Sequence, residues 1–372
     1  MMANTPIYLD NQATTPLAPE VFDVMVPWLR DNFGNPHSSH ILGRKAAAIV
    51  DLARDQVAGL LPKDGTVLFT GTATEALNTG FGAVHAAKAK GRNKIIILES
   101  EHAAVRDTAM SYAKRGFMVE RHAVGPDGIV SLEQLRASID DKTALVAAML
   151  VNNEIGVIQP VEEIAELAHQ NGALMLCDVV QGYGRIAIPG NIDIAAISAH
   201  KIYGPKGIGA LWVRGGIDLP PLIYGGGQEE GIRSGTLSPA LCAGFGQAAA
   251  LCKKRWDSDA AHIAALADKA RSCFADWTVN GSIAHRYPGN LNIRRDGLDV
   301  ARLMSDVRNV AFSAGSACAS GSGSPSHVLA ALGLEPARIK ASIRLGFGRY
   351  NSLKDIEIAA KYINEAVEVQ LA

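Results

Sequence analysis

Short apolar runs alternate with helix-like segments over residues 66–214, and this alternation constrains the fold more than any other feature of the chain. The runs are rich in Val, Ile, Leu and Ala and are nearly continuous. Such runs are typical of parallel strands that helices cover on both faces. This order predicts an α/β domain with a mostly parallel sheet. The expected strands are 66–70, 94–98, 117–122, 143–151, 174–178, 192–198 and 209–213, and the expected helices are 73–90, 103–114, 131–139 and 161–171.

The composition changes after the glycine turn at 225–227. A long Ala-rich helical stretch, short strands and a closing helix follow, and they predict a second, smaller α/β domain. We therefore expect a large domain over 15–256 and a small domain made of 1–14 and 257–372. The small domain includes a Gly/Ser-rich loop at about 313–326. The expected elements are a helical stretch at 239–275, strands near 290–294, 310–313 and 342–347, and a final helix from Leu353.

The bulk composition argues against several classes of protein. The 372 residues are 48% hydrophobic and carry a net charge of −1, so a nucleic-acid-binding surface is not expected. No apolar run reaches the length of a membrane span. The N-terminus lacks the basic and apolar segments of a secretory signal, so we expect a cytoplasmic protein. The five cysteines are odd in number and fit no zinc spacing, which argues against a disulfide framework.

A lysine and an aspartate each follow a buried run. Lys201 stands in the segment Ser198-Ala199-His200-Lys201, directly after one apolar run, and Asp178 ends another. An enzyme that uses pyridoxal 5'-phosphate (PLP) needs this pair. The lysine holds the cofactor aldehyde as a Schiff base, and the aspartate pairs with the pyridine nitrogen. The sequence therefore predicts PLP as cofactor.

The segment 69–75 joins a predicted strand to a predicted helix through small residues. The amide groups at a helix N-terminus favour an anion, and Thr74 adds a hydroxyl. Taken alone, the segment is better explained as an ordinary turn with Thr72 as N-cap. Together with the lysine and the aspartate, we interpret it as a phosphate cup, to which Ser198 and His200 add donors.

Two further polar residues follow strands of the same predicted sheet. His102 would face the crevice at the carboxyl ends of the strands, where an imidazole can stack on a pyridine ring and transfer protons. The alternative for a lone histidine is a surface position. Asn153 follows the strand expected at 143–151, where a buried polar residue usually has a hydrogen-bonding role toward cofactor or substrate.

Several segments resemble those of the cysteine desulfurases, which are PLP enzymes of the class V aminotransferase group with fold type I. The similarity runs in order from residue 8 to about residue 350. It implies a homodimer with a PLP-binding large domain and a smaller α/β domain. The matching segments are 8–16, 35–40, 151–156, 198–209, 225–229 and 315–318.

The resemblance implies a role for each residue around the cofactor. Lys201 is then the Schiff-base lysine, Asp178 the partner of the pyridinium, and His102 the residue stacked on the ring. Gln181 would bond the phenolic oxygen. The cofactor phosphate would be held by Ala73, Thr74, Ser198 and His200, with Thr236 reaching the phosphate of the partner subunit.

The resemblance also implies that Asn153 and Arg344 bind the substrate, with Asn153 close to the cofactor as well. A guanidinium suits a carboxylate because it forms two parallel hydrogen bonds with it. A structural salt bridge is the alternative for Arg344, and Arg349 is the competing candidate.

Cys318 distinguishes the cysteine desulfurases from other members of the class V aminotransferase group. A thiolate on a Gly/Ser loop is a suitable nucleophile, and a chance exposed thiol is the alternative. The resemblance implies that L-cysteine is converted to L-alanine with a persulfide on Cys318. The sulfur would then pass to an acceptor or scaffold protein for iron–sulfur cluster assembly. No resident metal is expected, and ligation of iron–sulfur by Cys318 during transfer is the one metal role considered.

The chain departs from the family pattern at Gly71-Thr72, Leu77 and Glu230, where the family usually has Ser-Gly, a polar residue and arginine. These departures bear on cofactor affinity, helix packing and a contact with the partner subunit. Two alternatives to the desulfurase remain. One is a selenocysteine lyase or another class V lyase or aminotransferase, and the other is an inactive scaffold subunit.

Overall fold

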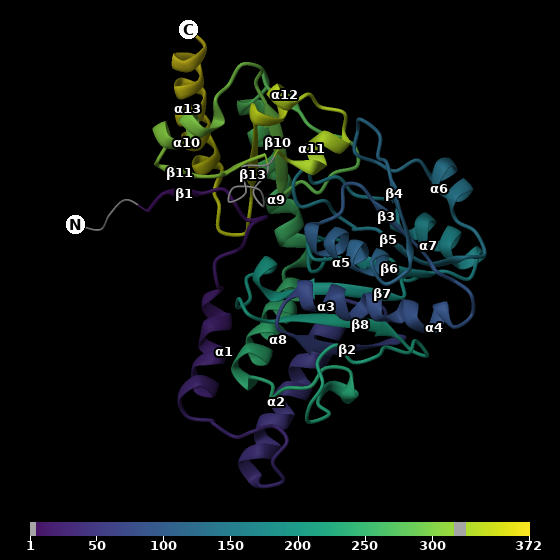
Figure 1. The fold of residues 1–372 in the computed structure, drawn as a ribbon. Coiled ribbons are helices and arrows are strands. Elements are labelled where there is room, and N and C mark those ends of the chain that lie inside the picture. Colours follow the sequence, from purple (N-terminus) through teal and green to yellow (C-terminus); the bar gives the residue numbers. More distant parts are fainter. Residues whose placement is uncertain (1–4, 316–324) are drawn as a thin grey trace.

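The computed structural model describes residues 5–315 and 325–372, and its largest sheet has seven strands in the order β2-β8-β7-β6-β5-β3-β4 (Figure 1). Strand β8 runs antiparallel to both of its neighbours, and the other strand pairs are parallel. The predicted α/β fold with a mostly parallel sheet is confirmed. The strands are β2 (Gly65–Thr70), β3 (Lys94–Leu98), β4 (Met118–His122), β5 (Thr143–Ala147), β6 (Leu174–Asp178), β7 (Ile194–Ser198) and β8 (Gly209–Arg214).

The continuous apolar runs are explained by two cores, one on each face of this sheet. In β3, Ile95 and Ile97 belong to one core, while Ile96 and Leu98 belong to the other. Successive side chains of a strand point to opposite faces, so a strand covered on both faces is apolar at nearly every position. All five residues of β3 are buried.

Helices α3, α4 and α5 pack on one face of the sheet, and α2 and α7 pack on the other. Helix α8 joins the second face, where Phe245 lies 6.3 Å from Phe69 of β2 between ring centroids. Helices α1 and α2 pack on α8, and α6 packs on α7. These helices are α1 (Pro19–Arg30), α2 (Ile41–Ala58), α3 (Ala73–Gly80), α4 (Val84–Lys88), α5 (Ala103–Ala113), α6 (Leu132–Ser138), α7 (Val161–Gln170) and α8 (Pro239–Lys254).

The C-terminal part lies above the large sheet in Figure 1 and contains an antiparallel sheet in the order β12-β13-β10-β9. Strand β1, near the N-terminus, pairs in parallel with β11 of this part. The proposed boundary between large and small domains stays a prediction. The elements are β1 (Ile7–Tyr8), β9 (Thr278–Val279), β10 (Asn290–Arg294), β11 (Val310–Ala311), β12 (Ser313–Ala314), β13 (Ser342–Gly346), α9 (Trp256–Cys273), α10 (Val300–Asp306), α11 (His327–Ala331), α12 (Pro336–Lys340) and α13 (Leu353–Leu371).

Three predicted elements differ from the structure. The helix expected at 73–90 is divided into α3, a 3-10 turn η1 (Phe81–Ala83) and α4, at a point where Gly80 and Gly82 lower the helix propensity. The strand expected at 143–151 ends at Ala147, because the amide of Met149 donates to a side chain at 2.7 Å instead of to a neighbouring strand. The helical stretch expected at 239–275 is broken at Arg255 into α8 and α9.

Gly209 brings three strands together at one edge of the sheet. It pairs with Thr70 at the end of β2 and with Ser198 at the end of β7. A Cβ atom on Gly209 would lie 2.6 Å from the carbonyl carbon of Thr72 and 2.7 Å from the amide nitrogen of Ala73. The absence of a side chain therefore allows the first turn of α3 to approach the start of β8.

We expect Gly209→Ala to lower the free energy of unfolding by about 1–3 kcal/mol, because backbone atoms must move to accommodate the methyl group. Urea denaturation followed by circular dichroism measures this change. Gly190→Ala is the matched control, since a Cβ there meets nothing within 4 Å. We expect the control to change stability by less than about 0.5 kcal/mol. Equal stability of the two variants would contradict the close-approach argument.

Candidate active site

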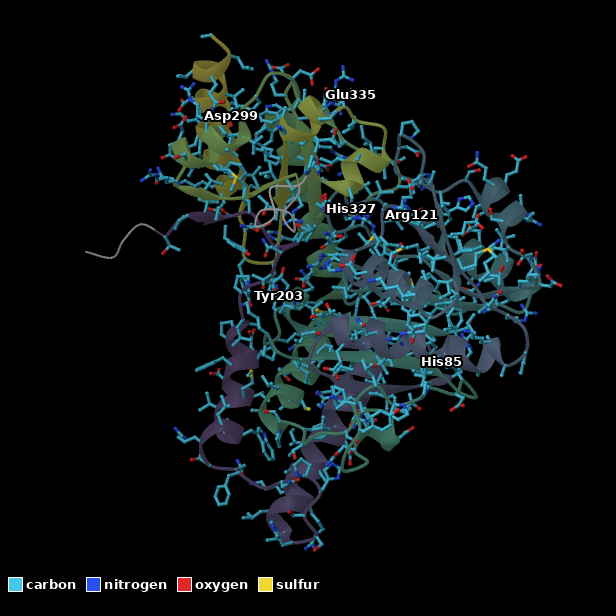
Figure 2. All side chains as sticks on the ribbon, in the orientation of Figure 1. His85, Arg121, Tyr203, Asp299, His327 and Glu335 are labelled. Carbon is cyan, nitrogen blue, oxygen red and sulfur yellow. The ribbon has the colours of Figure 1, made fainter. Side chains whose placement is uncertain are left out.

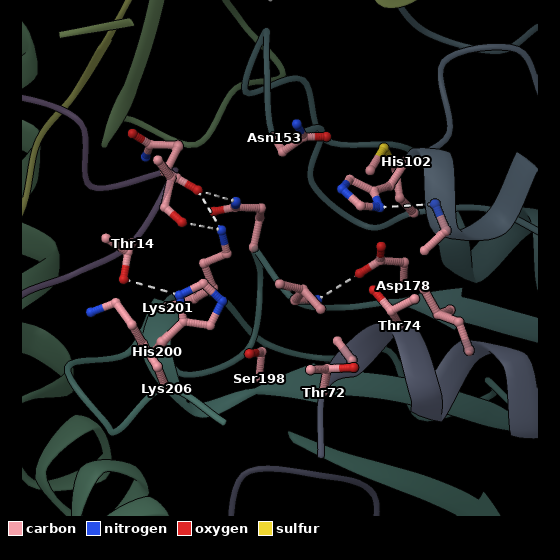
Figure 3. A pocket seen from close by; sticks show the side chains of 18 of the residues that line it. Thr14, Thr72, Thr74, His102, Asn153, Asp178, Ser198, His200, Lys201 and Lys206 are labelled. Carbon is pink, nitrogen blue, oxygen red and sulfur yellow. Dashed lines mark hydrogen bonds between the residues drawn. The ribbon is translucent and has the colours of Figure 1, made fainter. Parts of the chain in front are cut away.

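A cavity of about 530 Å³ lies at the edge of the sheet where β2, β6 and β7 end (Figure 3). This volume is in the range of pockets that hold a cofactor or a small ligand. The cavity is lined by ten of the residues expected from the sequence: Ala73, Thr74, His102, Asn153, Asp178, Gln181, Ser198, His200, Lys201 and Arg344. It also contains lining residues that the sequence analysis did not select, among them Gln12, Ala13, Thr14, Met149 and Lys206.

Lys201 ends the short 3-10 helix η2 (Ala199–Lys201), which follows β7 directly. Its Nζ donates hydrogen bonds to the carbonyl oxygens of Gln12 and Ala13, both at 2.7 Å (Figure 3). The N-terminal segment therefore passes the edge of the large sheet where the cavity lies, and its carbonyl groups hold the amine in the cavity. Sequence patterning could not place residues 12–14 here, because they are distant in the chain and outside the strand–helix alternation.

Asp178 ends β6 and is only 6% exposed. Its Oδ1 accepts a hydrogen bond from the amide of Val180 at 2.9 Å. Burial raises the pKa of the Asp178 carboxyl above its usual value, while His102, the Val180 amide and Lys201 act in the opposite direction. A buried carboxyl of this kind is stabilised in its ionised form by a cation placed against it, which is what a protonated ring nitrogen supplies.

His102 is the N-cap of α5, and its Nδ1 accepts a hydrogen bond from the amide of Ala104 at 3.1 Å. Since Nδ1 is an acceptor, the neutral ring carries its proton on Nε2. Figure 3 shows the imidazole and the Asp178 carboxyl in the same cavity. The hydrogen bond to Ala104 thus fixes both the tautomer and the position of the ring.

The first turn of α3 forms the opposite end of the cavity. Thr72 caps the helix by accepting a hydrogen bond from the amide of Glu75 at 3.1 Å. The carboxylate of Glu75 in turn accepts a bond from the amide of Gly71 at 2.8 Å. Within the described ranges, the amides of Ala73 and Thr74 have no hydrogen-bond partner. These two donors and the helix dipole suit an anion.

His200 lies beside this anion site and shares a hydrogen bond of 3.0 Å between its Nδ1 and Oγ1 of Thr14. Burial, followed by the positive charges of Lys201, Lys206 and Arg185, lowers the pKa of His200 to about 4. The imidazole is therefore neutral near pH 7. It can bond a phosphate as a neutral donor while nearby lysines supply the positive charge.

Arg344 comes from β13, in the C-terminal part, and its side chain is 1% exposed. Its Nη2 contacts Oδ1 of Asp10 at 2.7 Å, and its Nη1 donates to the carbonyl of Asn153 at 3.0 Å. The salt bridge expected as the alternative is present, and the residue also lines the cavity, so its contact with a substrate stays a prediction. Arg349 contacts Asp259 at 2.7 Å and does not line this cavity.

These residues fit PLP. The cavity contains an amine, a buried carboxyl that needs a cation, and an anion site at a helix N-terminus. Among the residues that the structure describes, three buried atoms of its lining, Oε1 of Gln12, Oδ1 of Asn153 and Nε of Arg344, have no hydrogen-bond partner. Buried polar atoms are rarely left without a partner, so unpaired atoms in a cavity indicate that a ligand completes them.

The sequence analysis expected two further site residues, Thr236 and Cys318. Thr236 is exposed and does not line this cavity, so its predicted contact with a partner subunit stays a prediction. Cys318 lies outside the described residues. Of the departures from the family pattern, Gly71, Thr72 and Leu77 line the cavity, and Glu230 is exposed in a left-handed conformation with φ of 58°.

Two buried carboxyl groups lie next to the site, and the sequence analysis selected neither as a functional candidate. Glu101 is completely buried, and its Oε1 accepts a hydrogen bond from the amide of Met149 at 2.7 Å. Burial raises the pKa of Glu101 well above its usual value. Burial also raises the pKa of Glu154, whose Oε2 accepts a hydrogen bond of 2.5 Å from Ser326. No pattern in the sequence distinguishes a buried glutamate after a strand from an exposed one.

The C-terminal part contacts the same edge of the large sheet through the start of α11. His327 Nε2 lies 2.8 Å from the carbonyl oxygen of Glu101, and Figure 2 shows His327 where the two parts meet. Across 5–315 and 325–372, no group of three or more His, Cys, Asp or Glu side chains could hold a metal ion. The helices of the same ranges include none that is both long and apolar enough to cross a bilayer.

Comparison with known proteins assigns the family. The chain matches the aminotransferase class-V family over residues 7–358. It is 43% identical to the mitochondrial cysteine desulfurase of Saccharomyces cerevisiae over 98% of this chain and 75% of that protein. It is 41% identical to the cysteine desulfurase IscS of Rickettsia bellii over 96% of this chain and 90% of that protein.

A solved structure described as a NifS-like protein superposes with a TM-score of 0.91 at 30% identity, covering 98% of this chain and 100% of that one. The two proteins are therefore similar in fold as well as in sequence, and the similarity includes both the large sheet and the C-terminal part. This chain therefore belongs to the class-V aminotransferase family, a family of PLP-dependent enzymes with fold type I.

Proposed function

We propose that this chain is a cysteine desulfurase, which converts L-cysteine to L-alanine and supplies the sulfur for iron–sulfur cluster assembly. One observation carries the proposal. Lys201, Asp178 and the N-terminus of α3 meet in a single cavity, in a chain whose full-length relatives are named cysteine desulfurases.

Bound PLP supplies an electron sink that stabilises negative charge at the α-carbon of an amino acid. Lys201 would hold the cofactor through Nζ and, once released by the substrate, take the α-proton on the same atom. Asp178 would keep a proton on the ring nitrogen. The amides of Ala73 and Thr74, with Ser198 and neutral His200, would bind the phosphate.

Arg344 and Asn153 would orient the substrate. The guanidinium of Arg344 is fixed by Asp10 and by the Asn153 carbonyl, so it needs little reorganisation to accept a carboxylate. Within the described part of the chain, Oδ1 of Asn153 and Nε of Arg344 are unpaired buried atoms that a substrate would complete. Prior fixation of a binding group lowers the entropy lost when the substrate binds.

Cys318 would be the nucleophile for sulfur. Its thiolate would attack the substrate sulfur, so that an S–S bond forms while the C–S bond breaks. The electron pair of the C–S bond stays on carbon and takes up a proton, which gives alanine. The products are a persulfide on Cys318 and L-alanine, and the persulfide sulfur would pass to an acceptor protein.

A homodimer and a cytoplasmic location complete the proposal. Large apolar side chains are exposed on and between α1 and α2, including Phe22 (53%), Leu29 (66%) and Phe33 (83%). Exposed apolar groups of this size in one region favour a protein–protein interface. Thr236, which is exposed, would then be available to the cofactor phosphate of the partner subunit.

The decisive test is Cys318→Ala. We expect this variant to bind PLP normally but to lose sulfide release from L-cysteine in the presence of a thiol reductant, by at least about 100-fold, because the nucleophile is absent. Mass spectrometry of the wild-type protein after incubation with L-cysteine should find a mass increase of one sulfur on the peptide with Cys318. Cys273→Ala, which removes a half-buried thiol, is the control and should keep full activity. Normal sulfide release from Cys318→Ala would refute the assignment, and preference for selenocysteine would favour the lyase alternative.

Asp178→Asn tests the electrostatic role of the carboxylate. Asparagine keeps the Oδ1 that accepts from Val180, so the local fold should persist. We expect kcat for alanine formation to fall about 10²–10³-fold, because a neutral amide does not hold the ring nitrogen protonated. Asp193→Asn is the control, since Asp193 is also buried but bonds the amide of Met175 away from the cavity. The control should change stability and not turnover per bound cofactor, and a loss of less than tenfold in Asp178→Asn would contradict the role.

The lowered pKa of His200 makes the stability of the cofactor-free chain depend on pH. The imidazole of His200 takes up a proton near pH 6.5 in the unfolded chain but only near pH 4 in the folded protein. Stability should therefore fall as the pH falls through this window. We expect His200→Asn to make the fall shallower in urea denaturation between pH 4 and 7. His37→Asn, at an exposed histidine, is the control and should keep the wild-type dependence of stability on pH. An unchanged profile in His200→Asn would show that the imidazole is charged in the folded state.

A further inference from the structure

Arg185 connects two of the residues assigned to the cofactor. It lies in the segment between β6 and β7 and is half-buried. One guanidinium nitrogen, Nη1, donates to Oε1 of Gln181 at 2.6 Å, and the other, Nη2, donates to the carbonyl oxygen of Lys201 at 2.6 Å. One side chain thus bridges the residues that follow the two central strands of the site.

The contact with Arg185 determines how the amide of Gln181 is oriented. A guanidinium has only donors, so the atom of Gln181 that faces it must be the oxygen. On its other side, Nε2 of Gln181 donates to the carbonyl of Gln12 at 3.0 Å, and a carbonyl has only acceptor sites. The reversed amide would oppose donor to donor and acceptor to acceptor. Of the two hydrogens on Nε2, one is used by Gln12 and the second is available to the cavity that Gln181 lines.

The guanidinium itself is fixed in place. It lies over the ring of Tyr287, with its carbon 5.3 Å from the ring centroid, and Tyr287 is 8% exposed. Its Nη2 also lies 3.4 Å from the carbonyl of Asn11. Arginine suits this position because its planar fork reaches two acceptors in fixed directions while its face stacks on an aromatic ring.

We propose that Arg185 is a positioning residue of this site, which holds the Gln181 amide with its NH₂ group toward the phenolic oxygen of bound PLP and holds the backbone of Lys201 in register with it. This inference rests on the proposed function for the place of Lys201 at the cofactor, and on the family resemblance for the contact of Gln181 with the phenolic oxygen. Arg185 does not line the main cavity and acts through the other two residues.

The test is a pH titration of the visible absorbance of the PLP-loaded protein. A donor to the phenolic oxygen stabilises the deprotonated, more negative form of the cofactor. In Arg185→Met the amide is free to turn, so we expect the midpoint of the absorbance change to rise by about one pH unit. Arg185→Lys restores one donor and should give an intermediate midpoint. Arg214→Met is the matched control, because Arg214 also donates to backbone carbonyls, those of Gly190 and Ile192, and does not line the cavity.

A double-mutant cycle separates positioning from a general structural role. We expect Gln181→Ala to raise the midpoint by itself, and Arg185→Met to add less than about 0.3 unit in that background, because the two residues act through one hydrogen bond. Equal shifts in both backgrounds would overturn the proposal. A lower melting temperature in Arg185→Met with an unchanged midpoint would overturn it as well. If Arg185→Met does not fold, the comparison of Arg185→Lys with wild type decides, and an unshifted midpoint there refutes the proposal.

The readout is independent of desulfuration. A protein that shows the shift and the coupling but forms no alanine from cysteine would overturn the proposed function and leave the role of Arg185 intact. A normal desulfurase without the shift would overturn only the role of Arg185.

Discussion

Burial of the large sheet on both faces is the constraint on which the rest of this structure depends. Since helices cover both sides, polar side chains are excluded from the interiors of the central strands and accumulate where these strands end. The parallel direction of β2, β6 and β7 brings those ends to one edge of the sheet. Asp178 and Ser198 are the last residues of their strands, and Lys201 follows three residues later. The site is therefore a consequence of how the sheet is buried, and strand direction decides which polar residues meet.

The electrostatics of the site follow from the same burial. Asp178 lies in a low-polarity environment that disfavours its charge, and His200 is kept neutral for the same reason together with nearby cations. A ligand with a cationic ring nitrogen would compensate the charge of Asp178 at one end of the cavity. Its anionic phosphate would occupy the anion site at the other end. Hydrogen-bond donors and acceptors that are in position before a ligand binds interact strongly with it, because little water competes for them. The fit to PLP rests on this complementarity of charge as well as on the volume of the cavity.

The N-terminal segment joins the two parts of the chain at the cavity. Thr15 donates to the carbonyl of His200 at 3.0 Å and accepts from the amide of Tyr203 at 2.7 Å, which fastens the segment to the Lys201 turn. Tyr203, labelled in Figure 2, has a positive φ of 67°, and the guanidinium carbon of Arg349, from the C-terminal part, lies 4.3 Å from its ring centroid. A non-glycine residue with positive φ is held by the contacts around it. The Lys201 turn is therefore held by residues from both ends of the chain.

The sequence by itself determined the α/β class, the carboxyl ends of most strands of the large sheet, and the residues that local chemistry selects. Lys201, Asp178, His102 and the 69–75 turn were identifiable because each follows an apolar run, and the apolar period reports burial directly. Only the tertiary structure decided that Arg344 of β13 and not Arg349 lines this cavity, that Glu101 is fully buried, and that Arg185 donates to Gln181. These facts depend on contacts between segments far apart in the chain or on the direction of one side chain. Local patterning contains no information on either, because the same residue types occur equally on exposed turns.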